Sequence, residues 1–260
     1  MATFTTDHWD THVAEVRHDD VLVRGVPLTG LMSEAGLADV AYLVLTGRRA
    51  SQGQARVLEA LMVSTIEHGI SPSSTVARMM ASYGVPIQVG IAAGQLTVGD
   101  YHGGAGEQIA GRFRDLLDTM GPADSAASIR ELAETFVAKS RAARTPIEGF
   151  GHPQHGADPR TPVLLDLART HGVYGDACLL MEEVEAALEA HVGRRIPANI
   201  DGVCAALLLD LGIDPRAARP VLMASRVIGL AAHFLEEVDQ GSKWRHVPAE
   251  KVVYTPGPQQ

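Results

Sequence analysis

The stretch PRAARPVLMASRVIGLAAHFLEEVDQG, residues 215–241, has the apolar spacing of a long helix. Its apolar residues recur at the intervals of three or four residues that mark a helix. Residues with this spacing point to the same side of a helix, where they can pack against a neighbour. The stretch therefore predicts one long helix near the end of the chain.

Helical periodicity continues outward from this stretch through most of the chain. Ser51 and either Asp124 or Ser125 are expected N-caps, because their side chains can accept bonds from the first backbone N–H groups of a helix. Gly47 and Gly69 are expected to stop helices, since glycine readily adopts the left-handed conformation found there. The predicted helices cover residues 32–48, 51–69, 74–83, 86–96, 104–119, 124–142, 161–172, 175–193 and 200–212.

Short strands are expected near the N-terminus, in VAEV (13–16) and VLVRGVPL (21–28), and one short extended piece is expected in the tail at 250–260. Farther along, no strands alternate with helices, which argues against a doubly wound sheet. Proline and glycine cluster at 146–160, a polar break that we expect between two helical subdomains. The sequence therefore predicts an all-α, mainly helical fold.

Composition excludes several classes of protein. Hydrophobic residues make up 46% of the 260 residues and charged residues 20%, which is typical of a compact cytoplasmic protein. The net charge of −9 argues against nonspecific nucleic-acid binding. No apolar run reaches the roughly 18–20 residues of a membrane span, and the polar, acidic N-terminus does not resemble a signal peptide. Cys178 and Cys204 lie in apolar stretches, where we expect them to pack as small hydrophobic side chains.

A second informative stretch is GFGHPQHGADPR, residues 149–160. His152 and His155 have a spacing seen in metal pairs, but no cysteine or carboxylate set completes a zinc site. Asp158 is placed to cap the next helix. Arg160 then falls in the first turn of that helix, where a cation is unfavourable, so its presence suggests an anionic ligand.

The stretch GDYHGGAGEQ, residues 99–108, places His102 before three glycines. Glycine lets a ligand or backbone approach closely, and a helix N-terminus favours negative charge. A plain turn also explains the pattern. A dinucleotide site lacks the strand that should precede it. The esterase oxyanion loop, which HGGAG resembles, lacks any G-x-S-x-G nucleophile in this chain.

Asp201 is the third unusual residue, because it stands at the start of the apolar stretch IDGVCAALLLDLG. One explanation is an ordinary N-cap. The other is a general base whose pKa is tuned by apolar neighbours. The sequence leaves both open.

Taken together and in order, these stretches resemble the motifs of the citrate synthase superfamily. The G-[FYV]-G-H…D-P-R motif corresponds to Gly149–Arg160, and the histidine before a helix to His102–Gly103. The P-N-[IV]-D motif corresponds to Pro197–Asp201, and S-R-x-x-G to Ser225–Gly229. Residues 24–51 also look like an early segment of the family. Several ordered motifs are far more specific than any one of them.

The length and the ending are closer to the short citryl-CoA lyase type, the module also found at the end of ATP-citrate lyase. Residues 233–254 resemble the C-terminal segment of that module. The resemblance implies a citrate synthase-like helical fold with a truncated large domain and a small domain. The implied division is a polar N-terminal segment (1–25), large-domain helices (26–145), a small helical domain with the substrate loop (146–225), and a large-domain return helix and tail (226–260).

The chemistry of this family makes or breaks the bond between an acetyl thioester carbon and a ketone carbon. It requires a base, a neutral donor to the enolate oxygen, and a group facing the ketone. By resemblance, Asp201 is the base, His102 the donor to the thioester oxygen, and His152 the group at the ketone or tertiary hydroxyl. In the lyase direction, His152 accepts the hydroxyl proton and Asp201 protonates the acetyl-CoA enolate.

The resemblance also assigns substrate-binding residues. Arg160, Arg226 and Arg245 match the carboxylate-binding arginines, whose planar forks suit carboxylates. His68, in EHG, matches a substrate-binding histidine. Two structural alternatives stay open. His68 can cap a helix end through a favourable contact with the helix dipole, and Arg245 can be an ordinary residue of the tail.

Coenzyme A in this family lies partly against the loop before the catalytic histidine, here PIEGFG. The expected contacts are largely with backbone, at Ile147, Gly149, Phe150 and Gly151. No catalytic part is expected for the remaining histidines considered: His155, His171, His191 and His233.

The resemblance implies an enzyme that cleaves citryl-CoA to acetyl-CoA and oxaloacetate. The alternative is a short condensing enzyme that makes citrate or 2-methylcitrate from an acyl-CoA and a 2-oxo acid. A further alternative is a non-catalytic acyl-CoA-binding relative. The coenzyme A thioester enters as substrate, and no metal or redox cofactor is implied. The protein is expected to be a homodimer or higher homo-oligomer in the cytoplasm. No nucleic-acid or membrane partner is expected.

Overall fold

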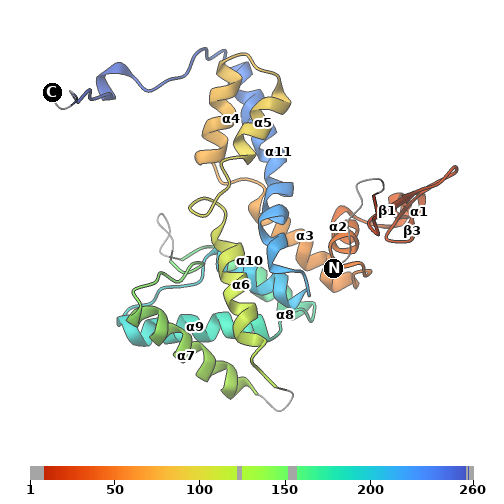
Figure 1. Ribbon diagram of the computed structural model, residues 1–260, viewed down its shortest axis with the longest axis vertical. Coiled ribbons are helices and arrows are strands. Elements are labelled where there is room, and N and C mark those ends of the chain that lie inside the picture. The colour runs from red at the N-terminus through yellow and green to blue at the C-terminus, as the bar shows by residue number, and fades with distance from the viewer. Residues whose placement is uncertain (1–8, 122–124, 152–156, 256, 258–260) are drawn as a thin grey trace. The chain divides into compact units, whose positions relative to one another are not determined.

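The computed structural model describes residues 9–121, 125–151, 157–255 and 257. These residues form eleven α-helices, two 3₁₀-helices and three short strands (Figure 1). The predicted mainly helical fold is therefore confirmed. The chain divides into two compact units, each described by itself below. The first unit contains Met1–Ser64 and Gly103–Val221, and the second contains Thr65–His102 and Leu222–Gln260.

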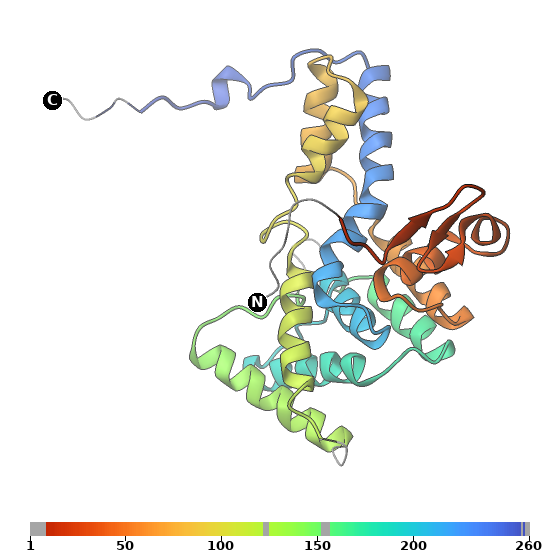
Figure 2. The ribbon, with the colours of Figure 1, turned by 45° about the vertical axis from the view of Figure 1, so that its right-hand side comes forward.

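The N-terminal part of the first unit is a small antiparallel sheet (Figure 2). Its strands are β1 (Ala14–Val16), β2 (Val21–Val23) and β3 (Val26–Pro27), in the order β1-β2-β3. Arg24 lies between β2 and β3, and its Nε and Nη2 donate to the Val44 carbonyl at 3.1 and 2.9 Å. Both predicted strand regions near the N-terminus are confirmed, and Arg24 ties the sheet to the helix that follows.

The predicted helix over 32–48 is wrong in one respect, because it is broken into two. α1 spans Leu28–Glu34 and α2 spans Leu37–Thr46. Gly36 lies at the N-cap of α2, and the Asp39 side chain accepts its backbone N–H at 2.9 Å. This local bond begins a new helix where periodicity alone suggested continuity. Gly47 ends α2 with a φ of 73°, as expected.

The hydrophobic core of the first unit forms around α10, whose inward side chains have almost no exposed surface. The helices α6, α8 and α9 pack against α10, and α7 packs beside α9 (Figure 1). Cys178 is buried and Cys204 half-buried in this core region. The helices are α3 (Gln52–Thr65), α6 (Ala105–Leu117), α7 (Ala126–Ala142), α8 (Arg160–Thr170), α9 (Asp176–Val192) and α10 (Ile200–Asp210).

The second unit contains α4 (Pro72–Ser82), α5 (Ile87–Gln95) and most of α11 (Ala218–Asp239). Close packing of α5 on α11 depends on glycine: a Cβ on Gly90 would lie 2.4 Å from the Phe234 ring. The two 3₁₀-helices are Pro215–Ala217, directly before α11, and Ala249–Lys251 in the tail.

Two expected helices start or end differently from the prediction. The helix expected over 215–241 consists of a 3₁₀ turn followed by α11. The helix expected over 51–69 ends at Thr65, four residues before Gly69. Residues on both sides of the 146–160 break lie in the first unit. The expected domain boundaries at 145/146 and 225/226 stay a prediction.

Candidate functional site

In the second unit, His68 lies in the turn between α3 and α4. Because α3 ends at Thr65, His68 lies three residues beyond the end of the helix rather than inside its last turn. The turn uses Gly69, with a φ of 69°. The His68 backbone N–H donates to Glu67 Oε1 at 2.8 Å. These local features leave the His68 side chain exposed.

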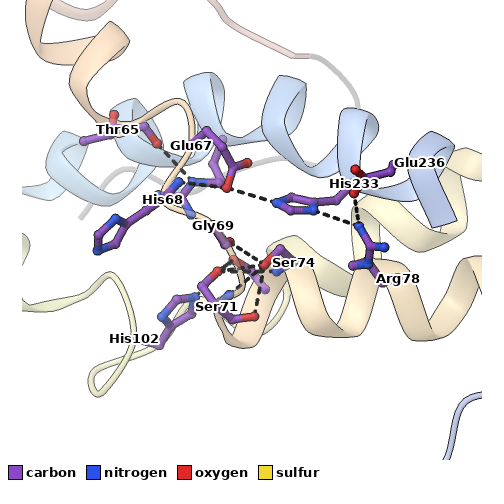
Figure 3. Close-up of polar contacts among 12 residues, drawn as sticks. Thr65, Glu67, His68, Gly69, Ser71, Ser74, Arg78, His102, His233 and Glu236 are labelled. Atoms are coloured by element: carbon purple, nitrogen blue, oxygen red, sulfur yellow. Dashed lines mark hydrogen bonds and ion pairs between the residues drawn. The ribbon is translucent and has the colours of Figure 1, made fainter. Parts of the chain in front are cut away.

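Serines at the start of α4 organise this turn, and Figure 3 shows two of them, Ser71 and Ser74. Ser71 is the N-cap, and its backbone N–H donates to Ser74 Oγ at 2.7 Å. The Ser74 hydroxyl donates to the Gly69 carbonyl at 2.9 Å. The Ser73 hydroxyl, which is buried, lies 3.2 Å from His102 Nε2. The N-terminus of α4 therefore holds the His68 turn and contacts the His102 ring.

His102 itself ends a tight turn. Gly99 and His102 exchange two backbone hydrogen bonds, of 2.9 and 3.0 Å. Burial lowers the pKa of the His102 imidazole below its ordinary value, and the positive charge of Arg226 lowers that pKa further. Both causes favour the neutral ring, which can donate one N–H and accept at its other nitrogen.

Arg226 brings a buried positive charge to the same unit. It is 8% exposed on α11, and its Nε donates to the Thr65 carbonyl at 3.0 Å. The hydroxyls of Thr65 and Ser225 lie 2.9 Å apart beside it. Arg226 acts electrostatically on His102 and on Glu67. The structure thus places the predicted residues His102 and Arg226 within one electrostatic environment.

A polar network connects the His68 turn to α11 (Figure 3). His233 Nε2 lies 3.0 Å from Glu67 Oε1, and Arg78 Nη1 lies 3.3 Å from His233 Nδ1. Because arginine only donates, Nδ1 accepts and Nε2 carries the proton toward Glu67. Burial raises the pKa of the Glu67 carboxyl, but bonds from the His68 N–H and His233 outweigh it and lower that pKa. A Cβ on Gly229 would lie 2.3 Å from Glu67 Oε2, so glycine is required there.

Arg245 has a different environment within the second unit. Its Nε donates to Glu237, whose side chain has no exposed surface, and its backbone N–H donates to Ser82 Oγ at 3.0 Å. Glu237 lies about three helical turns, or about 16 Å, beyond Arg226 along α11. Arg245 therefore anchors the tail in this chain, and its assignment to a substrate carboxylate stays a prediction.

In the first unit, Asp201 is the second residue of α10 and not its cap. Asn199 is the N-cap, and its side chain accepts from the backbone N–H groups of Asp201 and Gly202 at 2.9 and 3.4 Å. The N-cap explanation for Asp201 is therefore wrong. The half-buried Asp201 side chain lies beside the first turn of α6, where a Cβ on Gly106 would be 3.7 Å from Asp201 Oδ1.

The predicted coenzyme A loop is attached to the same end of α10. The Gly149 carbonyl accepts from the Asn199 backbone N–H at 2.9 Å, and the Gly151 N–H donates to the Pro197 carbonyl at 2.8 Å. A Cβ on Gly202 would lie 2.4 Å from the Gly149 oxygen, so the two backbones touch. Glycine at 149 and 202 is what permits this approach, and it brings Phe150 into a β-bridge with Ala198.

Arg160 is the first residue of α8 and is also joined to α10. Asp158 accepts from Arg160 Nε at 2.9 Å and from Arg160 Nη2 at 2.7 Å. It also accepts from the Ile200 N–H at 3.1 Å. Burial raises the pKa of the Asp158 carboxyl, but the bonds from Arg160 and Ile200 outweigh it and hold that pKa at about 2. Asp158 is thus an anionic partner of Arg160, and the expected anionic ligand stays a prediction. The predicted N-cap is wrong: Pro159 is the N-cap of α8, and Asp158, the residue before it, accepts from the Arg160 backbone N–H through Oδ1 at 3.0 Å.

The start of α10 therefore brings together Asp201, Arg160 and the loop at Ile147–Gly151, all in the first unit. His68, His102 and Arg226 belong to the second. His152 and His155 lie outside the described residues, so the role of His152 at the ketone stays a prediction.

Sequence reasoning missed several residues that hold the candidate site. The serines of α4 were missed although Ser71-x-x-Ser74 around Pro72 has the pattern of a helix start, which is the signal that identifies them. Asn199, two residues before Asp201, was the better N-cap by type and position. Glu67 and His233 gave no local signal, because their contact joins distant parts of the chain.

Two broader properties follow from the described ranges. Within them, no group of three or more His, Cys, Asp or Glu side chains is arranged to hold a metal ion. No helix there combines the length and apolar character needed to cross a membrane.

Comparison with known proteins finds one family repeatedly. Residues 45–247 match the family described as citrate synthase, C-terminal domain. The structure of citryl-CoA lyase from Hydrogenobacter thermophilus is 32% identical, has a TM-score of 0.87, and aligns over 97% of this chain and 96% of that chain. ATP citrate lyase from Methanothrix soehngenii, solved with citrate and coenzyme A, shares the fold at 23% identity and a TM-score of 0.84, over 99% of this chain and 43% of that chain.

Curated sequences show the same relationship at lower identity. Citrate synthase from Helicobacter pylori is 27% identical over 195 residues, which is 71% of this chain and 44% of that protein. The chain spans about half the length of the curated citrate synthases it matches. Together with the helical architecture, these matches confirm the predicted citrate synthase-like fold.

Proposed function

The chain belongs to the citrate synthase family, and from that premise we propose that it cleaves citryl-CoA into acetyl-CoA and oxaloacetate. The observation that carries the proposal is the extent of the match. The Hydrogenobacter citryl-CoA lyase aligns almost end to end, over 97% of this chain and 96% of that chain. By contrast, the matches to two curated citrate synthases cover 44% and 53% of those proteins.

Cleavage begins at the tertiary hydroxyl of citryl-CoA. His152 accepts the hydroxyl proton as the carbon–carbon bond breaks, and the hydroxyl carbon becomes the ketone of oxaloacetate. The bonding electrons pass to the acetyl group, which becomes an enolate. Asp201 then gives a proton to the enolate carbon and completes acetyl-CoA.

His102 stabilises the enolate by donating an N–H to the thioester oxygen. A neutral donor suits this task, and the lowered pKa of His102 supports it. Ser73, 3.2 Å from Nε2, orients the ring. The enolate oxygen therefore accepts a hydrogen bond from the neutral His102 ring rather than pairing with a protonated imidazolium.

The substrate has several carboxylates, which we assign to His68, Arg160, Arg226 and Arg245. Burial of Arg226 supports this role, because a cation removed from water interacts strongly with an anion. The contacts of Arg160 with Asp158 and Ser64 use three of its five N–H groups. The coenzyme A portion is assigned to the loop at Ile147, Gly149, Phe150 and Gly151.

A second candidate is condensation of an acyl-CoA with a 2-oxo acid, followed by thioester hydrolysis to citrate or 2-methylcitrate. The match to Helicobacter pylori citrate synthase favours it. Lyase and synthase share the carbon–carbon step, so the same side chains serve both. They differ in whether the citryl thioester is hydrolysed.

The proposal includes the expected surroundings of the enzyme. It acts as a homodimer or higher homo-oligomer in the cytoplasm, without a metal or redox cofactor. Light scattering on the purified chain measures its mass in solution, and dialysis against a chelator should leave its activity unchanged.

Purified protein supplied with citryl-CoA tests the reaction directly. Release of oxaloacetate, followed through malate dehydrogenase and NADH, is the expected result. Citrate with free coenzyme A as the only products would establish the condensing enzyme instead. Binding of coenzyme A without turnover would establish the non-catalytic relative.

A further inference from the structure

Arg112, on α6 of the first unit, makes an unusual set of contacts with the segment that leads into the coenzyme A loop. Its Nη1 donates to the Pro146 carbonyl at 2.9 Å and to Glu148 Oε2 at 2.7 Å. Its Nη2 donates to Ser140 Oγ at 2.9 Å. The guanidinium carbon also lies 4.5 Å above the Phe136 ring. One side chain thus joins α6 and α7 to the first half of the loop.

The second half of the loop is held by different means. Backbone bonds join Gly149 and Gly151 to Asn199 and Pro197 at the start of α10. Asn199 Nδ2 also donates to the Gly151 carbonyl at 2.5 Å. The loop is therefore fixed at one end by backbone contacts and at the other by the Arg112 side chain.

We propose that Arg112 is a positioning residue, which holds residues 146–151 in the conformation that receives the coenzyme A thioester. This inference rests on the proposed function for its ligand. Arg112 acts through the loop and makes no contact with the reacting atoms. Its second effect is to neutralise Glu148, whose charge would otherwise repel the phosphates of coenzyme A.

Arginine is required here because of geometry as well as charge. Its planar fork meets acceptors in two directions while its face covers Phe136. Lysine carries the same charge on a single ammonium group and cannot reproduce both the fork and the stacked face. Alanine leaves the half-buried Glu148 carboxylate without this counter-charge and releases the Pro146 carbonyl.

Loss of this anchor should appear mainly as weaker binding of the thioester. If the anchored loop conformation falls to about a tenth of the population, the apparent Kd rises about tenfold, because only that fraction binds. Chemistry on bound substrate depends on Asp201 and should change little. The expected signature is a higher KM with a nearly constant kcat.

Three variants test the inference: Arg112→Ala, Arg112→Lys and the matched control Arg130→Ala. Arg130 also pairs with a glutamate, Glu183, but joins α7 to α9 and does not contact the loop. Steady-state cleavage of citryl-CoA gives KM and kcat, and calorimetry gives the Kd for acetyl-CoA. Hydrogen exchange of the Gly151 and Asn199 amides reports loop anchoring without any need for turnover.

For Arg112→Ala we expect about a tenfold rise in KM and Kd, kcat within about twofold, and faster exchange of both amides. Arg112→Lys should fall between Ala and wild type, with about a threefold rise, and remains informative if Arg112→Ala does not fold. Arg130→Ala should match wild type. Unchanged KM and amide exchange in both Arg112 variants would overturn the inference, as would a fall in kcat with constant KM. Wild-type protein that neither binds acetyl-CoA nor cleaves citryl-CoA refutes the proposed function separately.

Discussion

The candidate residues of the two units are held in place by different kinds of contact. In the first unit, Asp201 and the second half of the loop, residues 149–151, depend on backbone hydrogen bonds, an asparagine cap and two touching glycines. In the second unit, His68 and its surroundings depend on side chains of arginine, glutamate, histidine and serine. The backbone contacts join uncharged groups, whereas the contacts among Glu67, His233 and Arg78 join ionisable side chains.

This difference separates two ways of building a site. The stability of a backbone-held site falls when side-chain volume is added, and it changes little with pH. A site held by charged side chains is sensitive to the loss of one partner, because the other charge is left partly buried. Each of the following changes tests one side of this contrast, from the largest expected effect to the smallest.

Replacing Asp201 with Asn should have the largest effect on activity. Asparagine has nearly the same shape as aspartate but cannot give or take the proton. General acid–base groups contribute about 10²- to 10⁴-fold to the rate. We expect kcat for citryl-CoA cleavage to fall about 10³-fold. Because Asn199 caps the helix, the melting temperature should change by only a few degrees.

Asn199→Ala is the complementary control for that experiment. It removes the cap and should cost roughly 1–2 kcal/mol of stability. If Asp201→Asn loses stability to the same extent while kcat falls less than threefold, Asp201 serves the helix and not the chemistry.

Replacing Arg78 with Met should strongly destabilise the second unit. Arg78 is 9% exposed, and its Nε lies 2.7 Å from Oε2 of the fully buried Glu237. Replacing Arg78 leaves the buried Glu237 carboxylate with its contact to Arg245 but without its contact to Arg78. Loss of one partner from a buried ion pair costs about 3 kcal/mol. Urea unfolding followed by circular dichroism measures the loss.

The exposed pair of Arg130 and Glu183 supplies the contrast, because its arginine side chain is 65% exposed. Arg130→Ala should cost less than about 1 kcal/mol. Equal losses for the two arginines would remove the distinction between buried and exposed pairs.

Replacing Gly202 with Ala tests the backbone-held site by volume. The new Cβ would lie 2.4 Å from the Gly149 carbonyl oxygen, and neither backbone can move without breaking the loop contacts. A loss of about 2 kcal/mol is expected. Thermal unfolding of the two variants Gly202→Ala and Gly111→Ala gives a direct comparison.

Gly111 lies inside α6 with nothing within 4 Å of a built Cβ. Alanine there should stabilise the protein by about 0.5–1 kcal/mol, because it favours the helix. Similar destabilisation at both glycines would show that crowding at Gly202 is not the cause.

The two units also differ in how much of their candidate site could be predicted from the sequence. The loop, Asp201 and Arg160 belong to contiguous motifs, and Gly47 ends α2 as the local signal predicts. Contacts between distant side chains were not predictable, because periodicity does not say which residues meet across helices. Glu67, His233 and Arg78 are examples, since they come from a turn and two different helices.

Replacing Ser73 with Ala should have a moderate effect on activity. The hydroxyl 3.2 Å from His102 Nε2 orients the ring, and a single positioning bond of this kind is worth about 1.4 kcal/mol, or tenfold in kcat. Kinetics with Ser71→Ala, which affects the helix start, provides the control. A drop in kcat for Ser71→Ala alone would assign the effect to the helix.

The smallest expected effect is the pH response of His102. Its lowered pKa keeps the ring neutral below its ordinary titration range, near pH 6.5. Since the folded value lies below the unfolded one, the stability associated with this ring is lost as pH falls from about 6.5 through the folded value. Histidine-labelled NMR, assigned with His102→Gln, should give a midpoint below 6.5; a midpoint above it contradicts the neutral-donor role.

The most direct test of the central claim is the isotope content of acetyl-CoA formed from citryl-CoA in D₂O. Cleavage through an acetyl-CoA enolate, protonated on carbon from an exchangeable group, predicts acetyl-CoA with one deuterium in its methyl group, together with oxaloacetate. Citrate and free coenzyme A without any acetyl-CoA, or acetyl-CoA free of deuterium, would contradict it.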